Sequence, residues 1–101
     1  MIEISRRKDG LKITGHAGYA EPGQDIVCAG VSVLAQTLVA SLEELTTDKI
    51  NYSISPGRVE IKHGDLSEQA QTLVSSFFIG VGMIADAYPA YVRVRKFGKA
   101  E

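Results

Sequence analysis

The chain has 101 residues, 45% of them apolar, and a formal net charge of −1, which together describe one small globular domain. Its single cysteine excludes an internal disulfide and a zinc site built from several thiolates. The near-zero net charge provides no global positive field, so direct nucleic-acid binding is not expected. Because no secretory leader pattern is recognised and no uninterrupted apolar run reaches about 18 residues, we expect a cytoplasmic protein without a membrane partner.

Alternating apolar residues predict two β-hairpins. Residues 1–8 predict a strand, Asp9 and Gly10 suit a tight turn, and residues 11–14 predict the second strand. The same alternation around a central turn predicts the second hairpin. Its apolar and turn residues are Ile50, Tyr52, Ile54, Pro56, Gly57, Val59 and Ile61.

Each predicted hairpin is followed by a stripe of apolar residues at helical spacing. The first predicts a helix from residue 26 to about residue 48, with Asp25 as its N-cap. The second predicts a helix that opens on a capping box at residues 65–68, with Asp65 as the cap, and ends before Pro89. Residues 91–97 alternate apolar and basic side chains and predict a last strand. The order ββαββαβ predicts an α+β fold for residues 1–101, a single two-layer domain with two helices packed on a mixed five-stranded sheet.

The second predicted helix is apolar on nearly every side between residues 77 and 85. It also contains Gly80 and Gly82, and each glycine in a helix interior costs about 1 kcal/mol relative to alanine. Close helix packing in a homodimer explains both features, and so does deep burial within one chain. The sequence leaves these two explanations open.

The residues with reactive side chains gather between positions 15 and 32. With Asp25 as N-cap, Cys28 lies in the first helical turn, where backbone N–H groups lack partners and the helix dipole favours a thiolate. His16 ends the strand that leads into this segment, and an imidazole beside a thiol is the usual activation of a cysteine nucleophile. The pattern predicts a reactive thiol, and the alternative is a cysteine that only packs in the core.

Two further residues are candidates for supporting roles. Asp25 either caps the helix, orients His16 or does both, and Ser32 follows Cys28 by one turn and is placed to donate a hydrogen bond. His63 is expected to lie in a loop. No close spacing of ligand residues predicts a metal site, so neither a metal nor a cofactor is expected.

Basic residues recur along the first and last predicted strands. We interpret them as charged strand edges that keep the protein soluble. The alternative is a docking surface for RNA or for a peptide laid along an edge. These residues are Arg6, Arg7, Lys8, Arg93, Arg95 and Lys96.

The segment GHAGYAEPGQDIVCAGVS resembles the ribosomal-processing cysteine protease family, Prp. The shared pattern is H-x₈-D-[IV]-[VI]-C-[AS]-[AG]-V-S, with Gly30 where many members carry alanine. Length and element order are similar as well, so the resemblance covers nearly the whole chain. It implies a small homodimeric cysteine protease in which Cys28 is the nucleophile and His16 the general acid and base, while Asp25 and Ser32 match supporting positions.

The resemblance also implies a substrate. Members of the family remove a short N-terminal extension from a large-subunit ribosomal protein, the bacterial one numbered twenty-seven, and cut after a phenylalanine. Residues 17–24 are similar to a mobile loop that closes on the substrate. From the residues alone, the alternative is a non-enzymatic ribosome-associated or redox-sensing module, which needs a reactive thiol but does not need His16.

Overall fold

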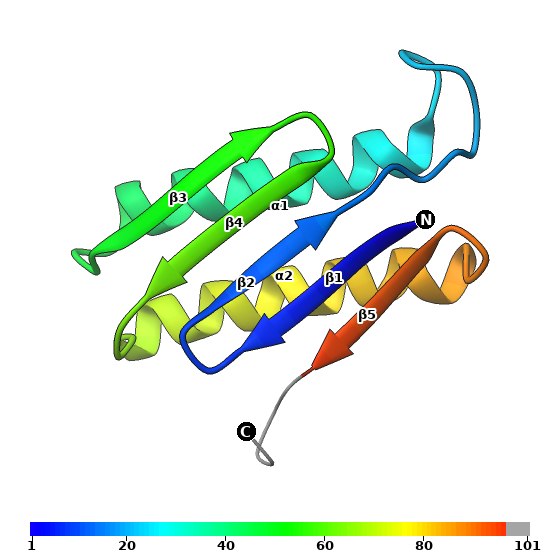
Figure 1. The fold of residues 1–101 in the computed structure, drawn as a ribbon. Helices are drawn as coiled ribbons and strands as arrows, with labels where there is room; N and C mark the ends of the chain where they lie inside the picture. The colour runs from blue at the N-terminus through cyan, green and yellow to red at the C-terminus, as the bar shows by residue number, and fades with distance from the viewer. Residues whose placement is uncertain (97–101) are drawn as a thin grey trace.

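Figure 1 shows the computed structural model, in which two helices cover one face of a five-stranded sheet. The structure describes residues 1–96. The elements in chain order are β1 (Ile2–Arg7), β2 (Gly10–Thr14), α1 (Ile26–Leu45), β3 (Ile50–Ser55), β4 (Arg58–His63), α2 (Glu68–Ala87) and β5 (Val92–Lys96). This confirms the α+β class and the ββαββαβ order, while Phe97, predicted as part of the last strand, lies outside the described residues.

The strands lie in the order β3-β4-β2-β1-β5. Both hairpins are antiparallel, and β2 also pairs antiparallel with β4, which joins the hairpins at the centre of the sheet. Among the paired strands of residues 1–96, β1 and β5 alone pair in parallel, because α2 carries the chain across one face before β5 pairs with β1. The sheet is therefore mixed, as predicted.

The core lies between the sheet and the two helices. Alternate strand residues point toward the helices, and the apolar helix stripes meet them there. Leu45, predicted as the last residue of the first stripe, is 67% exposed, because α1 ends at that residue. The buried residues are Ile2, Ile4, Leu11, Ile13, Ala17, Val27, Val31, Ala35, Leu38, Val39, Leu42, Ile61, Ala70, Val74, Phe77, Phe78, Val81 and Val92.

The second helix begins later than predicted. Its N-cap is Ser67, whose hydroxyl accepts a hydrogen bond from the Ala70 N–H at 3.1 Å, so the prediction of Asp65 as the cap is wrong. The physical reason is Asp48, which accepts hydrogen bonds from the N–H of Ser67 at 2.8 Å and from its hydroxyl at 2.6 Å. The two bonds fix Ser67 at the helix start and lower the pKa of Asp48 below its ordinary value, the hydroxyl having the larger effect.

Both helices are 20 residues long and, averaged along a window, apolar enough to pass for membrane spans by length and composition. A search for uninterrupted apolar runs does not find these two segments, because polar residues interrupt each helix. A helix that packs one face on a sheet reaches the same average, and both helices have such a buried face.

The two glycines of α2 differ in their surroundings. Gly80 faces α1, where a Cβ atom would come 3.0 Å from Leu34 Cδ1, so close packing within the chain accounts for this glycine. Gly82 has open space around it, with nothing within 4 Å of a Cβ. Beside it, Ile79 and Met83 are 67% and 68% exposed. Packing within the chain therefore explains Gly80, but it does not explain Gly82 or the exposed apolar side chains of Ile79 and Met83.

Candidate active site

Asp25 is the N-cap of α1, as predicted, and its carboxylate organises the helix start. Oδ1 accepts a hydrogen bond from the Cys28 N–H at 2.9 Å, which places Cys28 in the first turn. Oδ2 accepts from the N–H of Tyr19 at 3.0 Å and from that of Ala20 at 3.5 Å. The N–H of Cys28 above all, with those of Tyr19 and Ala20, lowers the pKa of Asp25 below its ordinary 3.8. One carboxylate thus connects residues 17–24 to the helix start.

The aromatic ring of Tyr19 gives the same loop a second attachment. It packs edge to face on Tyr88, with the centroids 5.4 Å apart, and on Tyr91, with the centroids 5.3 Å apart. Such pairs contribute about 0.5–1.5 kcal/mol each beyond the area they bury. The loop is therefore held at Tyr19 and Asp25, and the expected motion of the loop applies to the residues between them.

His16 owes its position to two glycines. Gly15 has a φ of +93°, and its N–H donates to the Gly57 carbonyl at 2.9 Å, which ties the end of β2 to the β3–β4 turn. The imidazole then lies against Gly57, where a Cβ atom would come 2.7 Å from Nε2. Gly57 itself has a φ of +73°, so both the space and the backbone conformation require glycine at this turn.

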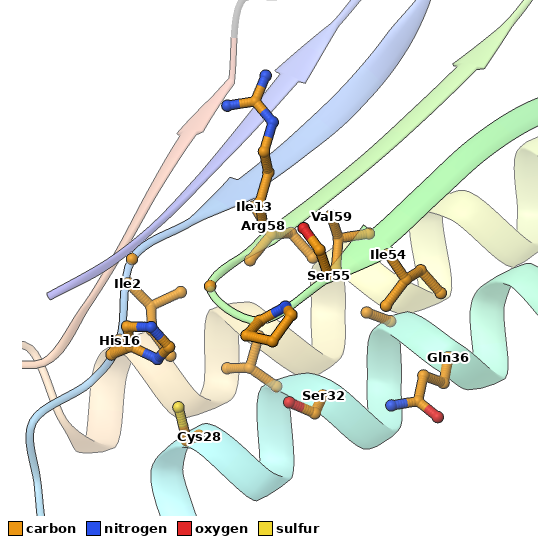
Figure 2. Close-up of a pocket in the computed structure, with 15 residues that line it drawn as sticks. Ile2, Ile13, His16, Cys28, Ser32, Gln36, Ile54, Ser55, Arg58 and Val59 are labelled. Carbon is orange, nitrogen blue, oxygen red and sulfur yellow. The ribbon is translucent and has the colours of Figure 1, made fainter.

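The structure brings Cys28, His16 and Ser32 together. All three line two adjacent pockets, which meet at these residues. Figure 2 shows the Cys28 sulfur directed from α1 toward the imidazole of His16, with the Ser32 hydroxyl one turn further along the helix. Asp25 lines only one of the pockets, and the hydrogen bonds that its carboxylate accepts come from backbone N–H groups.

The first pocket, here called the hairpin-side pocket, lies between α1 and the β3–β4 hairpin and has a volume of about 420 Å³. Apolar side chains form much of its wall, among them Ile13, Val31 and Ile54. Gln36 joins Cys28 and Ser32 on the same side of α1 (Figure 2). Sequence reasoning missed Gln36, although the spacing of 28, 32 and 36 places the three on one helical face.

The second pocket, here called the loop-side pocket, lies between α1 and residues 17–24 and has a volume of about 710 Å³. Its lining includes Pro22, Gly23, Ile26 and Ala29, together with the three residues that it shares with the hairpin-side pocket. Cavities of these two sizes fall in the range of ligand-binding sites. An extended peptide therefore has room on either side of Cys28.

The second histidine lies elsewhere. His63 is the last residue of β4, where it pairs with Ile50, so the prediction of a loop position is wrong. Its Nδ1 lies 2.7 Å from the Gly64 carbonyl oxygen. Within residues 1–96, no group of three or more His, Cys, Asp or Glu side chains is arranged to hold a metal ion.

The family model for the cysteine protease Prp matches residues 1–93 of the chain. Two relatives named ribosomal processing cysteine protease Prp are each 31% identical to it. The Staphylococcus aureus relative aligns over 83 residues, which cover 79% of this chain and 78% of its own. The Mycoplasma genitalium relative aligns over 100 residues, which cover 95% and 96%.

Solved structures share the fold. Prp from S. aureus, in complex with a covalently linked product peptide, has a TM-score of 0.85 at 24% identity, covering 94% of this chain and 96% of its own. A protein from Streptococcus mutans has a TM-score of 0.76 at 31% identity, covering 94% and 90%. The two-layer arrangement of Figure 1 is therefore the arrangement of these proteins.

Proposed function

The chain belongs to the cysteine protease Prp family, and from this premise we propose that it removes a short N-terminal extension from a large-subunit ribosomal protein, the bacterial one numbered twenty-seven. The cut follows a phenylalanine, and the reaction takes place in the cytoplasm, where a lone thiol stays reduced. The observation that supports this most is the meeting of Cys28 and His16 where the two pockets join.

The proposed reaction is acyl transfer through Cys28. The thiolate form of Cys28 attacks the scissile carbonyl carbon, and the carbonyl electron pair moves onto its oxygen. As the pair returns, the C–N bond breaks and the His16 imidazolium gives its proton to the leaving nitrogen. His16 then takes a proton from water, whose oxygen attacks the thioester, and the acid product leaves with the thiolate restored.

The geometry restricts which donors hold the oxyanion. The N–H of Cys28 already donates to Asp25, so it is engaged while that cap is in place. Ser32 is one turn away, and its hydroxyl lies at the shared wall of both pockets. We assign the Ser32 hydroxyl as an oxyanion donor, a role in which loss of one hydrogen bond typically costs about 10²–10³ in rate.

The two pockets suggest how the peptide lies across the site. The apolar wall of the hairpin-side pocket suits the phenylalanine that precedes the cut. The loop-side pocket then receives residues after the cut, beneath the segment that Tyr19 and Asp25 anchor.

The active protein is proposed to be a homodimer. Gly82 with the exposed Ile79 and Met83 gives α2 an apolar outer face that no other element of residues 1–96 covers. On α1, Val33 is 63% exposed and adjoins Leu34, which packs against Gly80. A second copy of the chain supplies an equivalent apolar face, as a two-fold symmetric contact requires.

The test of the protease proposal is incubation with the extended ribosomal protein, followed by mass measurement of the products. Cys28→Ala is expected to fold and bind the substrate but release no product, because no other thiol is present. His16→Ala is expected to lower kcat/KM at least about a hundredfold, the usual contribution of a general acid and base. His63→Ala is the matched control and is expected to cleave normally, since His63 lines neither pocket.

Cleavage by Cys28→Ala at the normal rate would exclude the mechanism. If His16→Ala instead melts at a much lower temperature than His63→Ala, the role of His16 is structural. A redox-sensing module, the alternative that the residues alone allow, predicts that thiol labelling of Cys28 is rapid and independent of His16, with no peptide cleavage. The family match favours the protease.

The dimer is tested by sedimentation. Met83→Glu is expected to convert the protein to monomers, because it buries a charge in the proposed interface. Gln69→Glu places the same charge on an exposed position near the start of the same helix and is expected to leave the dimer intact. Wild-type protein that sediments as a monomer at all concentrations up to the micromolar range contradicts the proposal.

A further inference from the structure

The sheet face opposite the helices, here called the open face, carries an excess of basic side chains. Strand residues alternate between the two faces, so the neighbours of buried Ile4, Ile13 and Ile61 point away from the helices. Figure 2 shows Arg58 directed away from the pocket in this manner. The charged residues of the open face are Glu3, Arg7, Lys12, Arg58, Glu60, Lys62, Arg93 and Arg95.

Six of these eight residues are basic, a formal excess of four positive charges. The whole chain has 11 basic and 12 acidic residues, so the remainder holds five basic and ten acidic ones. The net charge of −1 therefore averages a positive sheet face with an acidic remainder. The number of charged residues in the sequence does not reveal this separation of charge. It arises only when strands distant in the chain pair in one sheet.

The strand register distributes the positive charge over a broad area. Arg58 and Arg93 occupy one cross-strand row, while Lys12 and Arg95 occupy the next. The Nζ atom of Lys12 lies 4.0 Å from Oε2 of Glu60 in the second row. This ion pair offsets the charge of Lys12 and leaves that of Arg95. With strands about 4.8 Å apart and about 3.4 Å per residue, the basic groups of β4, β2, β1 and β5 span about 14 Å in each direction.

Arg6 marks the boundary of this surface. Its guanidinium lies 4.9 Å from the Phe78 ring centroid on the helix side of the sheet. Lys96 pairs with Arg6 in the β1–β5 register and shares that side. The basic residues of the first and last strands thus divide between two faces, and only Arg7, Arg93 and Arg95 belong to the open face.

We propose that the open face binds the phosphate backbone of RNA. A surface about 14 Å across is wider than one extended peptide and suits phosphates on two strands of a folded or duplex RNA. An anionic membrane is less well matched, because interfacial binding inserts large apolar side chains and the strand residues of this face include none. These strand residues also include no aromatic ring on which a base stacks, so binding is independent of RNA sequence.

The proposal goes beyond peptide cleavage and does not depend on it. An RNA-binding sheet face leaves the two pockets beside Cys28 free for the peptide, because α1 forms one wall of each pocket and Arg58 is the one charged residue of the open face that also lines either of them. A single protein molecule therefore has separate surfaces for RNA and for the peptide.

The experiment is a titration of a labelled RNA duplex of about 16 base pairs, a length that shape-reading domains span, with the full chain. Binding is expected to weaken with salt at a log–log slope between about −2 and −5, as six or fewer phosphate contacts require. Arg95→Glu is expected to reduce affinity about fivefold or more and to lower the slope by about one. Lys96→Glu makes the same charge change at the next residue, on the opposite face, and is expected to change affinity less than about twofold.

Circular dichroism and peptide cleavage by both variants serve as folding and activity controls, and both are expected to match the wild type. Absence of RNA binding in about 0.1 M salt overturns the proposal. Equal losses in Arg95→Glu and Lys96→Glu also overturn it, because they indicate general charge attraction. Stronger binding to phosphatidylserine vesicles or to polyglutamate than to RNA assigns the face to another partner and overturns it as well.

Discussion

The N-caps of the two helices make the same kind of hydrogen bond but differ in what surrounds them. Each helix has 20 residues, and each N-cap side chain accepts a hydrogen bond from the N–H three residues further on. In α2 this third residue is Ala70, which is fully buried. The cap hydroxyl of Ser67 donates in turn to Asp48, so this cap connects the segment after α1 to the start of α2.

In α1 the third residue is Cys28, which is half-buried and lines both pockets. The cap is a carboxylate, and its second oxygen holds the loop at Tyr19. The comparison teaches that the surroundings of a cap decide whether it belongs to a candidate active site. At Asp25 these surroundings are a thiol in the first turn, a loop on the second oxygen and His16 at the end of β2. Changes at the two caps should therefore separate activity from stability.

Among changes at the two caps, the largest effect is expected from Asp25→Asn. Asparagine is as good an N-cap as aspartate, so the Cys28 N–H keeps an acceptor and the melting temperature should change little. Its amide nitrogen cannot accept the Tyr19 N–H, so the loop loses this attachment and keeps only the packing of the Tyr19 ring on Tyr88 and Tyr91. We expect kcat/KM for peptide cleavage to fall about tenfold or more, a loss typical of misplaced substrate contacts. A large drop in melting temperature with normal kcat/KM would mean that Asp25 only caps the helix.

Ser67→Ala should give the opposite result. Loss of the cap costs about 1 kcal/mol of unfolding free energy, which lowers the melting temperature by about 4–8 °C in a domain of this size. Cleavage at a temperature where the variant is folded should match the wild type, because Ser67 lies in neither pocket. Ser67→Thr, which keeps a hydroxyl, should recover most of the stability. Reduced kcat/KM in folded Ser67→Ala would show that the two helix starts are coupled.

The smallest effect is expected in the dependence of folding stability on acidic pH. Because the pKa values of Asp25 and Asp48 are lowered in the folded protein, their contribution to stability is fully present above pH 3.8. It is lost as the pH falls below 3.8 through the lowered values, where protonation weakens the hydrogen bonds that each carboxylate accepts. Urea unfolding of Asp48→Asn on a series of falling pH values should show a weaker dependence than the wild type. An identical dependence would assign the acid sensitivity to other groups.

Errors in the sequence reasoning have physical causes. Asp65 and Ser67 are both good caps two residues apart, and the choice between them depends on Asp48, which lies 19 residues before Ser67. His63 precedes a glycine and so suggests a loop, yet pairing with Ile50 extends β4 to include it. In both positions a partner distant in the chain overrides the local preference.

The sequence by itself determined the element order, the two-layer class and the cap at Asp25, because each depends on residues within a few positions of one another. Only the tertiary structure decided that the His16 ring lies on Gly57, that Gln36 and the β3–β4 turn complete a pocket beside Cys28, and that basic residues collect on one face. These features arise when strands and helices distant in the chain pack together, and the periodicity of a single segment contains no information about its partners.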